Sequence, residues 1–99
     1  MSGFRLDIPP HVALVLRHLH PDLKRPIKAA LRAISQDPAI GEPLERELGG
    51  LLKYRVSRFR IAYAVDRTRR IIRVMAVGHR RRIYDDLTET IAQKKLSTR

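Results

Sequence analysis

Between Leu52 and Val65, apolar residues recur with the spacing of a half-buried strand, and this pattern constrains the fold more than any other feature. The apolar positions are Leu52, Tyr54, Val56, Phe59, Ile61, Tyr63 and Val65. Successive side chains of a strand point to opposite faces of a sheet. The pattern therefore predicts a sheet with one apolar face, for packing, and one basic face.

A hairpin is predicted inside this segment. Val56 and Phe59 are separated only by Ser57 and Arg58, which is the spacing of a two-residue turn. In that register Tyr54 lies opposite Ile61 on the apolar face, and Arg55 lies opposite Arg60 on the other. Ser-Arg is a poor sequence for such a turn, so a bulge in the register stays open.

The same part of the chain holds most of the charge. From Lys53 to Arg82 there are ten Arg, one Lys and a single acid, Asp66, which gives +10 of the formal net charge of +11. Such a balance indicates an acidic partner: nucleic acid, an anionic membrane or an acidic protein. Arginine binds phosphate oxygens bidentately, which favours a phosphodiester. A membrane surface would call for a basic amphipathic helix, which the sequence lacks.

The rest of the chain predicts one α+β domain over residues 1–99, with helices first and strands after. All six prolines precede residue 44. We expect a short opening strand at residues 4–8, one helix from Pro9-Pro10 to Pro21, and a second capped by Asp22 and ending before Asp37. The apolar stripe of the first helix is Val12, Val15, Leu16 and Leu19, and the second contributes Leu23, Ile27, Ala30, Leu31 and Ile34.

Three strands are expected at about residues 51–57, 58–66 and 70–78. The third is apolar on both faces except for Arg73, so it should lie inside the sheet. A short last helix is expected near Asp85, followed by a frayed tail at 94–99. The chain has no cysteine, which excludes disulfides and thiolate metal sites. We expect a cytoplasmic protein with no membrane segment and no cofactor.

The basic face has the groups needed to cut RNA without a metal. That reaction needs a base for the 2′-OH, cations for the charged transition state and a proton donor for the leaving oxygen. The candidates are Lys53, Arg60, His79, Arg80 and Tyr84. Tyr84 and His79 have structural readings of equal weight: a ring packed on the core, and a surface histidine in a turn. Arg73, His79 and Arg80 are expected near the arginine face, without a fixed register.

Several stretches resemble the toxins of the RelE/ParE superfamily, and specifically the RelE branch. They are LERELGGLLKYRV at 44–56, FRIAY at 59–63, VGHR at 77–80 and the pair Ile83-Tyr84. The resemblance covers roughly residues 4–87. It implies helices packed on one face of a small, twisted, mainly antiparallel sheet, and the toxin of a type II toxin–antitoxin pair. RelE-type members are metal-independent, ribosome-dependent endoribonucleases that cut messenger RNA by 2′-OH attack.

By position in the motifs, the resemblance implies that Arg60 stabilises the scissile phosphate and that Arg80 assists the transition state or the leaving group. Lys53 would be a base or an RNA contact, and Tyr84 would stack on or activate the nucleotide. His79 stands where members carry His or Lys. RNA contacts would come from Arg55, Arg58, Arg73, Arg81 and Arg82. The implied partners are an acidic antitoxin, messenger RNA and the ribosome, with no small-molecule cofactor.

Two other functions remain open from the sequence. ParE-type members share the fold but act on DNA gyrase and lack much of this residue set. A catalytically inactive module that binds RNA or the antitoxin would show the same charge. The general base, the cut-site preference and the oligomeric state are not determined by the sequence.

Overall fold

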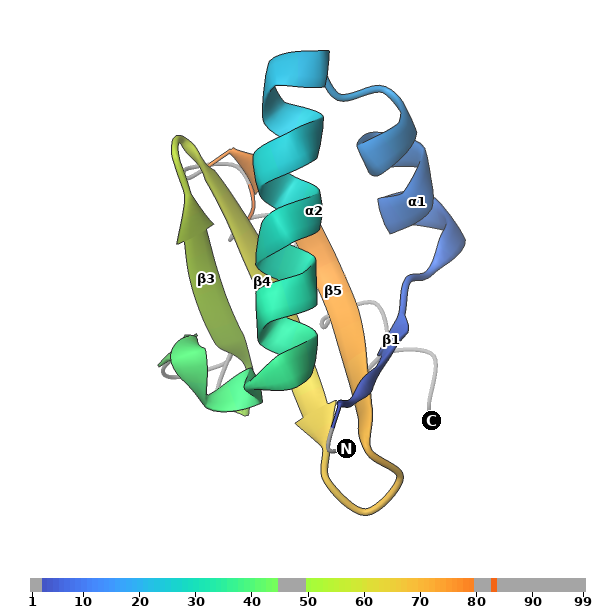
Figure 1. Cartoon of the computed structure of the whole chain (residues 1–99), viewed down its shortest axis with the longest axis vertical. Coiled ribbons are helices and arrows are strands. Elements are labelled where there is room, and N and C mark those ends of the chain that lie inside the picture. Colours follow the sequence, from blue (N-terminus) through green and yellow to red (C-terminus); the bar gives the residue numbers. More distant parts are fainter. Residues whose placement is uncertain (1–2, 45–49, 80–82, 84–99) are drawn as a thin grey trace, which may run out of the picture.

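The computed structural model describes residues 3–44, 50–79 and 83, and shows two helices on one face of a mixed sheet (Figure 1). Helix α1 spans Pro10–Arg17 and α2 spans Pro21–Gln36, followed by a short 3-10 turn, η1, at Pro38–Ile40. In Figure 1, α2 crosses in front of the central strands, and α1 lies beside it over β5 (Ile71–His79). The predicted α+β layering, with both helices on one face, is confirmed.

The helix boundaries follow the prolines, with one difference from the expectation. Pro21 begins α2 rather than ending α1, which stops at Arg17. The N-cap of α2 is His20, whose Nδ1 accepts a hydrogen bond from the backbone N–H of Asp22 at 3.1 Å. The predicted cap at Asp22 is therefore wrong. Because a proline is favoured at the first helical position, α2 begins at Pro21, and its N-cap lies two residues earlier in the chain than predicted. The predicted end before Asp37 is confirmed.

The buried faces of the helices agree with the apolar spacing, apart from one turn of α1. Val12 is buried and Leu16 packs on the core, as does Leu19 beyond the helix end. Val15, expected in the same stripe, is 39% exposed. The buried residues of α2 are Ile27, Ala30, Leu31 and Ile34, and Leu23, expected in the same stripe, is only partly buried.

Among the described residues, five strands form one sheet in the order β1-β5-β4-β3-β2. The strands are β1 (Arg5–Asp7), β2 (Glu42–Pro43), β3 (Leu52–Val56), β4 (Phe59–Asp66) and β5. The pairing of β1, left open by the sequence, is parallel to β5, and the other pairs are antiparallel. Strand β5 lies between β1 and β4, which confirms that it is interior.

The β3–β4 hairpin has the predicted register. Tyr54 pairs with Ile61 and Arg55 pairs with Arg60, with Ser57 and Arg58 in the turn. Ser57 has a φ of 56°, so the turn is made despite its unfavourable sequence. No bulge interrupts this pair of strands.

A bulge lies instead between β4 and β5. Ala62 pairs with Ala76 and Tyr63 with Val74, so Met75 is the extra residue on β5. The carbonyl of Met75 is 3.2 Å from Nε2 of His11 on α1. The extra residue shifts the alternation of β5, so that Val74 and Val77 both face the helices.

Packing is divided between the two faces of the sheet. The main core lies under the helices, and its largest fully buried side chain is Tyr63, whose hydroxyl donates a 2.7 Å hydrogen bond to the carbonyl of Pro38. On the other face, Ala62 and Ile83 are buried together, with Leu44, Leu51, Met75 and Ala76 around them. Ile83 is thereby fixed on the face opposite the helices. Within the described parts of the chain, no helix has the length and apolarity to cross a membrane.

Candidate phosphate-binding site

Two arginines face each other at the closed end of the β3–β4 hairpin. Arg55 on β3 and Arg60 on β4 are directly paired, and the partner of Arg60 on β5 is Gly78. Like charges opposite each other on neighbouring strands are destabilising by a few tenths of a kcal/mol or more. Both belong to the set that alternates away from the helices. We call Arg55, Arg60 and Lys53, which shares this face, the basic row.

Arg60 is not on an exposed surface, contrary to what its polar position in the strand suggests. It is 6% exposed, and one guanidinium nitrogen, Nη1, donates to the carbonyl oxygens of Phe59 at 3.1 Å and Ser57 at 3.5 Å. Among the described residues no carboxylate lies within ion-pair distance of it. Its described partners are therefore neutral dipoles, which leave the positive charge uncompensated for an anion.

Lys53 lies two residues along β3 from Arg55, a separation of about 7 Å. It pairs with Ala62 on β4 and with Glu42 on β2, so a carboxylate stands directly beside the lysine on the same face. Glu42 was missed in the sequence because Glu42–Pro43 is too short to show alternation and contains a proline. Pro43 is accommodated because β2 is an edge strand, where no partner needs its missing N–H.

Arg58 occupies the second position of the hairpin turn, where its side chain is exposed. It adds positive charge at the same end of the sheet as Arg55 and Arg60. The turn thus joins the predicted RNA-contact residues Arg55 and Arg58 to the predicted catalytic Arg60 in one short segment.

Arg73 and His79 are not brought to the basic row. Arg73 pairs with Ala64, and Gly78, the partner of Arg60, is five residues further along β5, about 16 Å for a regular strand. His79 is the last residue of β5, not part of a turn, and pairs with Phe59 with their ring centroids 4.9 Å apart. It therefore shares the face of Phe59, opposite that of Arg60.

The bulge at Met75 explains why Arg73 and His79 lie on opposite faces of the sheet. Six positions apart, they would share a face in an unbroken strand, but one extra residue between them reverses the alternation. Nothing in the sequence marks Met75 as the bulged position. Arg73 shares the face of Arg60 but lies far along the strand, whereas His79 lies on the opposite face, and the proposed roles of both residues stay predictions.

The remaining predicted site residues, Arg80, Arg81, Arg82 and Tyr84, lie outside the described residues, as do the expected helix near Asp85 and the tail at 94–99. In the part of the chain that is described, no three His, Asp or Glu side chains gather in a way that could hold a metal ion. The described site therefore consists of cations and one carboxylate.

This arrangement suits an oxyanion better than a neutral ligand. A guanidinium held at a fixed place can stabilise negative charge that develops on a phosphate. Lys53 and Glu42 lie two residues along the strands from the arginine pair, and a lysine and a carboxylate can orient or move a proton on a neighbouring hydroxyl. The geometry supplies charge stabilisation and a proton-transfer pair on one face of the sheet.

Comparisons with known proteins agree with this reading of the fold. Among solved structures, the chain is similar to the toxin–antitoxin complex RelBE2 of Mycobacterium tuberculosis, with 25% identity, 79% of this chain and 99% of that chain covered, and a TM-score of 0.70. A substituted form of Escherichia coli toxin RelE in the free state has 17% identity, coverages of 93% and 97%, and a TM-score of 0.74. A YoeB/ParE toxin from Agrobacterium tumefaciens has 17% identity, coverages of 76% and 96%, and a TM-score of 0.65.

No curated protein sequence matches the chain. A family model does match, over residues 9–84, and its description is the ParE toxin of type II toxin–antitoxin systems, parDE. The matched stretch begins just before α1 and continues beyond β5 to residue 84, and so includes the whole basic row. The chain therefore belongs to this family, within the RelE/ParE superfamily of type II toxins.

Proposed function

We propose that this toxin is an endoribonuclease that cuts messenger RNA on the ribosome, by attack of a ribose 2′-OH on the adjacent phosphodiester. The new bond joins the 2′ oxygen to phosphorus, and the bond to the 5′ oxygen breaks, which yields a 2′,3′-cyclic phosphate and a 5′-hydroxyl end. The observation that carries the proposal is Arg60, a nearly buried guanidinium whose described partners are backbone carbonyls alone.

Arg60 provides the charge stabilisation. Its bond to the Ser57 carbonyl, at 3.5 Å, is at the limit of a hydrogen bond, so Nη1 can exchange it for a phosphate oxygen at small cost. Arg55, directly opposite and exposed, then binds a second phosphate oxygen or the neighbouring phosphate. A bound phosphate would also offset the repulsion between the two arginines.

Proton transfer requires two further groups. Lys53 and Glu42, paired across β3 and β2, are the described candidates for taking the proton from the 2′-OH. Arg80 and Tyr84, in the segment after β5, are the proposed donors or positioning groups for the leaving oxygen. For Tyr84, a Tyr84→Phe variant that keeps wild-type activity would indicate stacking, whereas Tyr84→Ala should fail under either role, at a cost of about 1 to 3 kcal/mol for lost stacking.

An antitoxin is the second proposed partner. The RelBE2 and RelBE structures to which this chain is similar are toxin–antitoxin complexes. With a net charge of +11 on 99 residues, the cognate antitoxin segment should be acidic, and the complex should weaken as salt rises. We place both events in the cytoplasm, where translated messages are found.

The test is cell-free translation with the protein added, followed by primer extension on the message. Cuts inside translated regions are expected with wild type and should fall by orders of magnitude with Arg60→Ala, because transition-state charge stabilisation is lost. Arg60→Lys should rescue only partly, since lysine lacks the bidentate fork. Because Arg60 is buried, the variants must first be matched for folding by circular dichroism and urea unfolding.

Intact message in the presence of folded wild type would overturn the proposal. Trapped gyrase–DNA breaks in the same extract would instead indicate a ParE-like toxin. This alternative is suggested by the matching family model, which describes ParE toxins. Binding to RNA or antitoxin with neither effect would indicate a catalytically inactive module.

A further inference from the structure

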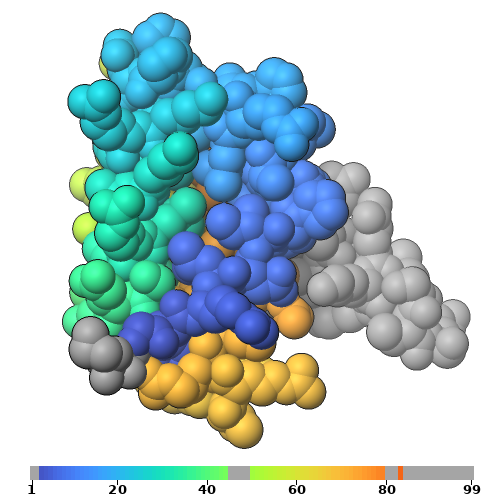
Figure 2. Space-filling view, turned by 45° about the vertical axis from the view of Figure 1, so that its right-hand side comes forward, coloured from blue at the N-terminus to red at the C-terminus, as the bar shows by residue number. Residues whose placement is uncertain are grey.

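We propose that the protein has a second RNA-binding surface, at the end of the sheet away from the basic row, where the β4–β5 turn meets β1. Five exposed arginines gather there, and we call them the turn patch: Arg5, Arg67, Arg69, Arg70 and Arg73. In Figure 1 the turn lies at the opposite end of β4 from the β3–β4 hairpin, and in Figure 2 it forms the gold lower end of the molecule. Its occupant is the phosphate backbone of a folded RNA, a second contact beyond the strand that is cut.

The turn patch is too far from Arg60 to belong to the same phosphate site. Asp66, the last residue of β4, is six residues beyond Arg60, which corresponds to about 20 Å along a strand. Ile83 and Ala62 are buried between the two regions on the basic face. One phosphate group therefore cannot contact both regions, and a ligand that spans them must extend over about 20 Å.

The backbone of the turn is held at both ends. Oδ1 of Asp66 accepts a hydrogen bond from the N–H of Arg69 at 3.0 Å, and the carbonyl of Arg70 accepts one from the N–H of Arg5 at 3.0 Å. The guanidinium of Arg70 lies 4.7 Å above the ring centre of Phe4. These contacts fix the places from which Arg67 and Arg69 project, so binding a phosphate there costs little ordering of the backbone.

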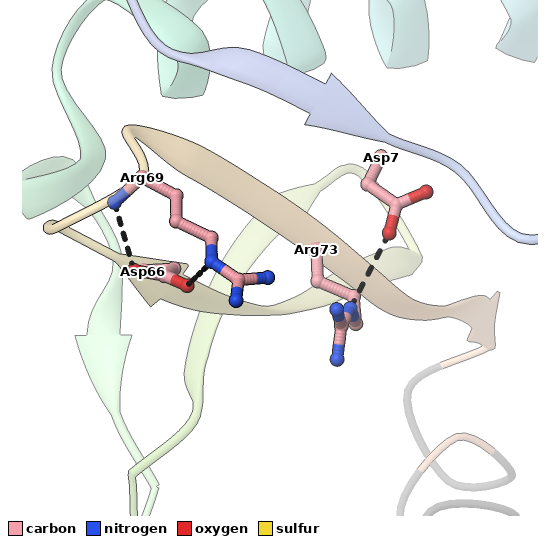
Figure 3. Close-up of polar contacts among 4 residues, drawn as sticks. All are labelled: Asp7, Asp66, Arg69 and Arg73. Carbon is pink, nitrogen blue, oxygen red and sulfur yellow. Dashed lines mark hydrogen bonds and ion pairs between the residues drawn. The ribbon is translucent and has the colours of Figure 1, made fainter.

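The two carboxylates in the patch do not account for the arginines. Arg69 Nε is 4.0 Å from Asp66 Oδ2, and Arg73 Nε is 3.3 Å from Asp7 Oδ2 (Figure 3), with all four side chains open to solvent. Exposed pairs of this kind contribute about 0 to 1 kcal/mol. Five arginines against two aspartates leave a charge of +3 at this end of the sheet.

Arg69 and Arg73 also line a small pocket of mixed polar and apolar lining. Its volume is about 110 Å³, and the other lining residues are Ala64, Val65, Asp66 and Ile71. That is the volume of roughly four water molecules at about 30 Å³ each, which is enough for a phosphate group. Figure 3 shows both groups on the side of the sheet away from the helices.

The composition of the patch suits a polyanion that carries phosphate groups. All five cations are arginine and none is lysine, and the fork of arginine matches phosphate oxygens bidentately. The identity of the polyanion as RNA rests on the proposed function. The presence of a second binding surface does not depend on whether the protein cuts RNA.

The experiment measures binding of the full chain to an RNA stem-loop longer than one helical turn, by fluorescence anisotropy over a range of salt. The variant is Arg67→Ala/Arg69→Ala, which keeps the backbone bond between Asp66 and residue 69. The matched control is Arg25→Ala/Arg32→Ala, which removes two exposed arginines from α2. The turn variant should weaken binding several-fold and lower the slope of log K against log salt by up to about 0.9 for each lost phosphate contact, the value for duplex DNA. The control should change both much less.

Equal weakening by the two double variants would overturn the proposal in favour of diffuse charge, and so would unchanged binding by the turn variant. If the turn variant no longer binds a Glu-rich peptide but still binds RNA, the proposal is overturned in favour of a protein partner. The message-cutting assay separates this inference from the proposed function. If wild type binds the stem-loop through the turn patch but leaves the message intact, the proposed function fails and the second surface stands.

Discussion

Arg55 and Arg60 are direct partners across β3 and β4, yet Arg55 is exposed to solvent while Arg60 is 6% exposed. The two arginines therefore have different electrostatic surroundings. The charge of Arg55 is screened by water. The charge of Arg60 is screened less, because the effective dielectric constant inside the protein is lower than that of water. The buried member is suited to stabilise a transition state, and the exposed member to attract and hold the substrate.

Replacing Arg55 should separate stability from function. Arg55→Ala removes the repulsion with Arg60, so the free energy of unfolding should stay the same or rise by a few tenths of a kcal/mol. RNA affinity should fall, because a phosphate contact is lost. Urea unfolding and RNA binding by anisotropy measure the two effects on one sample.

Arg25→Ala on α2 is the matched control, since it removes one exposed arginine of the helix layer. Two outcomes would show that Arg55 serves the fold and not a ligand. One is a loss of more than about 1 kcal/mol in the unfolding free energy of Arg55→Ala, well beyond the repulsion that the substitution relieves. The other is an RNA affinity equal to that of Arg25→Ala.

Glu42 provides a second prediction, because it is paired with Lys53 on the basic face. If this carboxylate takes the 2′-OH proton or orients Lys53, Glu42→Gln should lower single-turnover cleavage by about 10²- to 10⁴-fold. Binding of RNA should stay the same or tighten, since a negative charge is removed. Asp22→Asn on α2 is a control for the loss of one exposed carboxylate. Cleavage by Glu42→Gln at the rate of the Asp22 variant would remove Glu42 from the reaction.

The central hairpin could be predicted from the sequence because its information is local. Alternation determined the faces of β3 and β4, and the two-residue gap determined the pairing of Arg55 with Arg60. The same is true of the second helix, whose apolar spacing and flanking prolines determined its buried side and its end. In these elements a short stretch of chain contains everything that the structure needs.

What the sequence could not supply depends on contacts between distant residues. The burial of Arg60 arises only in the assembled sheet, where the residue pairs with Arg55 on one side and Gly78 on the other. The separation of Arg73 from His79 follows from the bulge at Met75, which has no local signature. The position of Glu42 beside Lys53 depends on the pairing of the two-residue edge strand β2 with β3, which the sequence did not predict.

Gly41 is predicted to be required for packing against Tyr63. A Cβ at Gly41 would collide with the Tyr63 hydroxyl and approach the carbonyl of Lys53 at 3.0 Å. Gly41→Ala should destabilise the protein by about 1 to 3 kcal/mol or more, as overpacking does. Gly3→Ala is the control, because a Cβ added there would meet no atom within 4 Å. In a Tyr63→Phe background, which removes the colliding oxygen, the cost of Gly41→Ala should shrink. An equal cost in both backgrounds would place the strain elsewhere.

The last prediction concerns stability at alkaline pH. Burial raises the pKa of Tyr63 above its ordinary value of 10.0, with Asp37 and Tyr54 adding to the rise and the backbone hydrogen bond of Gly41 opposing it. The folded state therefore holds the phenol proton more tightly than the unfolded chain does. This contribution to stability is fully present below pH 10.0, the unfolded value, and is lost as pH rises through the folded pKa.

Urea unfolding of wild type and Tyr63→Phe across this range isolates the effect, because the other titrating groups are common to both. Below pH 10.0 the difference in unfolding free energy should be constant, and wild type should be the more stable, since Tyr63→Phe leaves the Pro38 carbonyl without its 2.7 Å bond. Above that pH wild type should lose stability faster than the variant, because only wild type has a phenol that ionises in the unfolded chain while the folded state keeps its proton. A difference that stays constant to the alkaline limit of folding would mean that Tyr63 ionises as readily in the folded protein as in the unfolded chain.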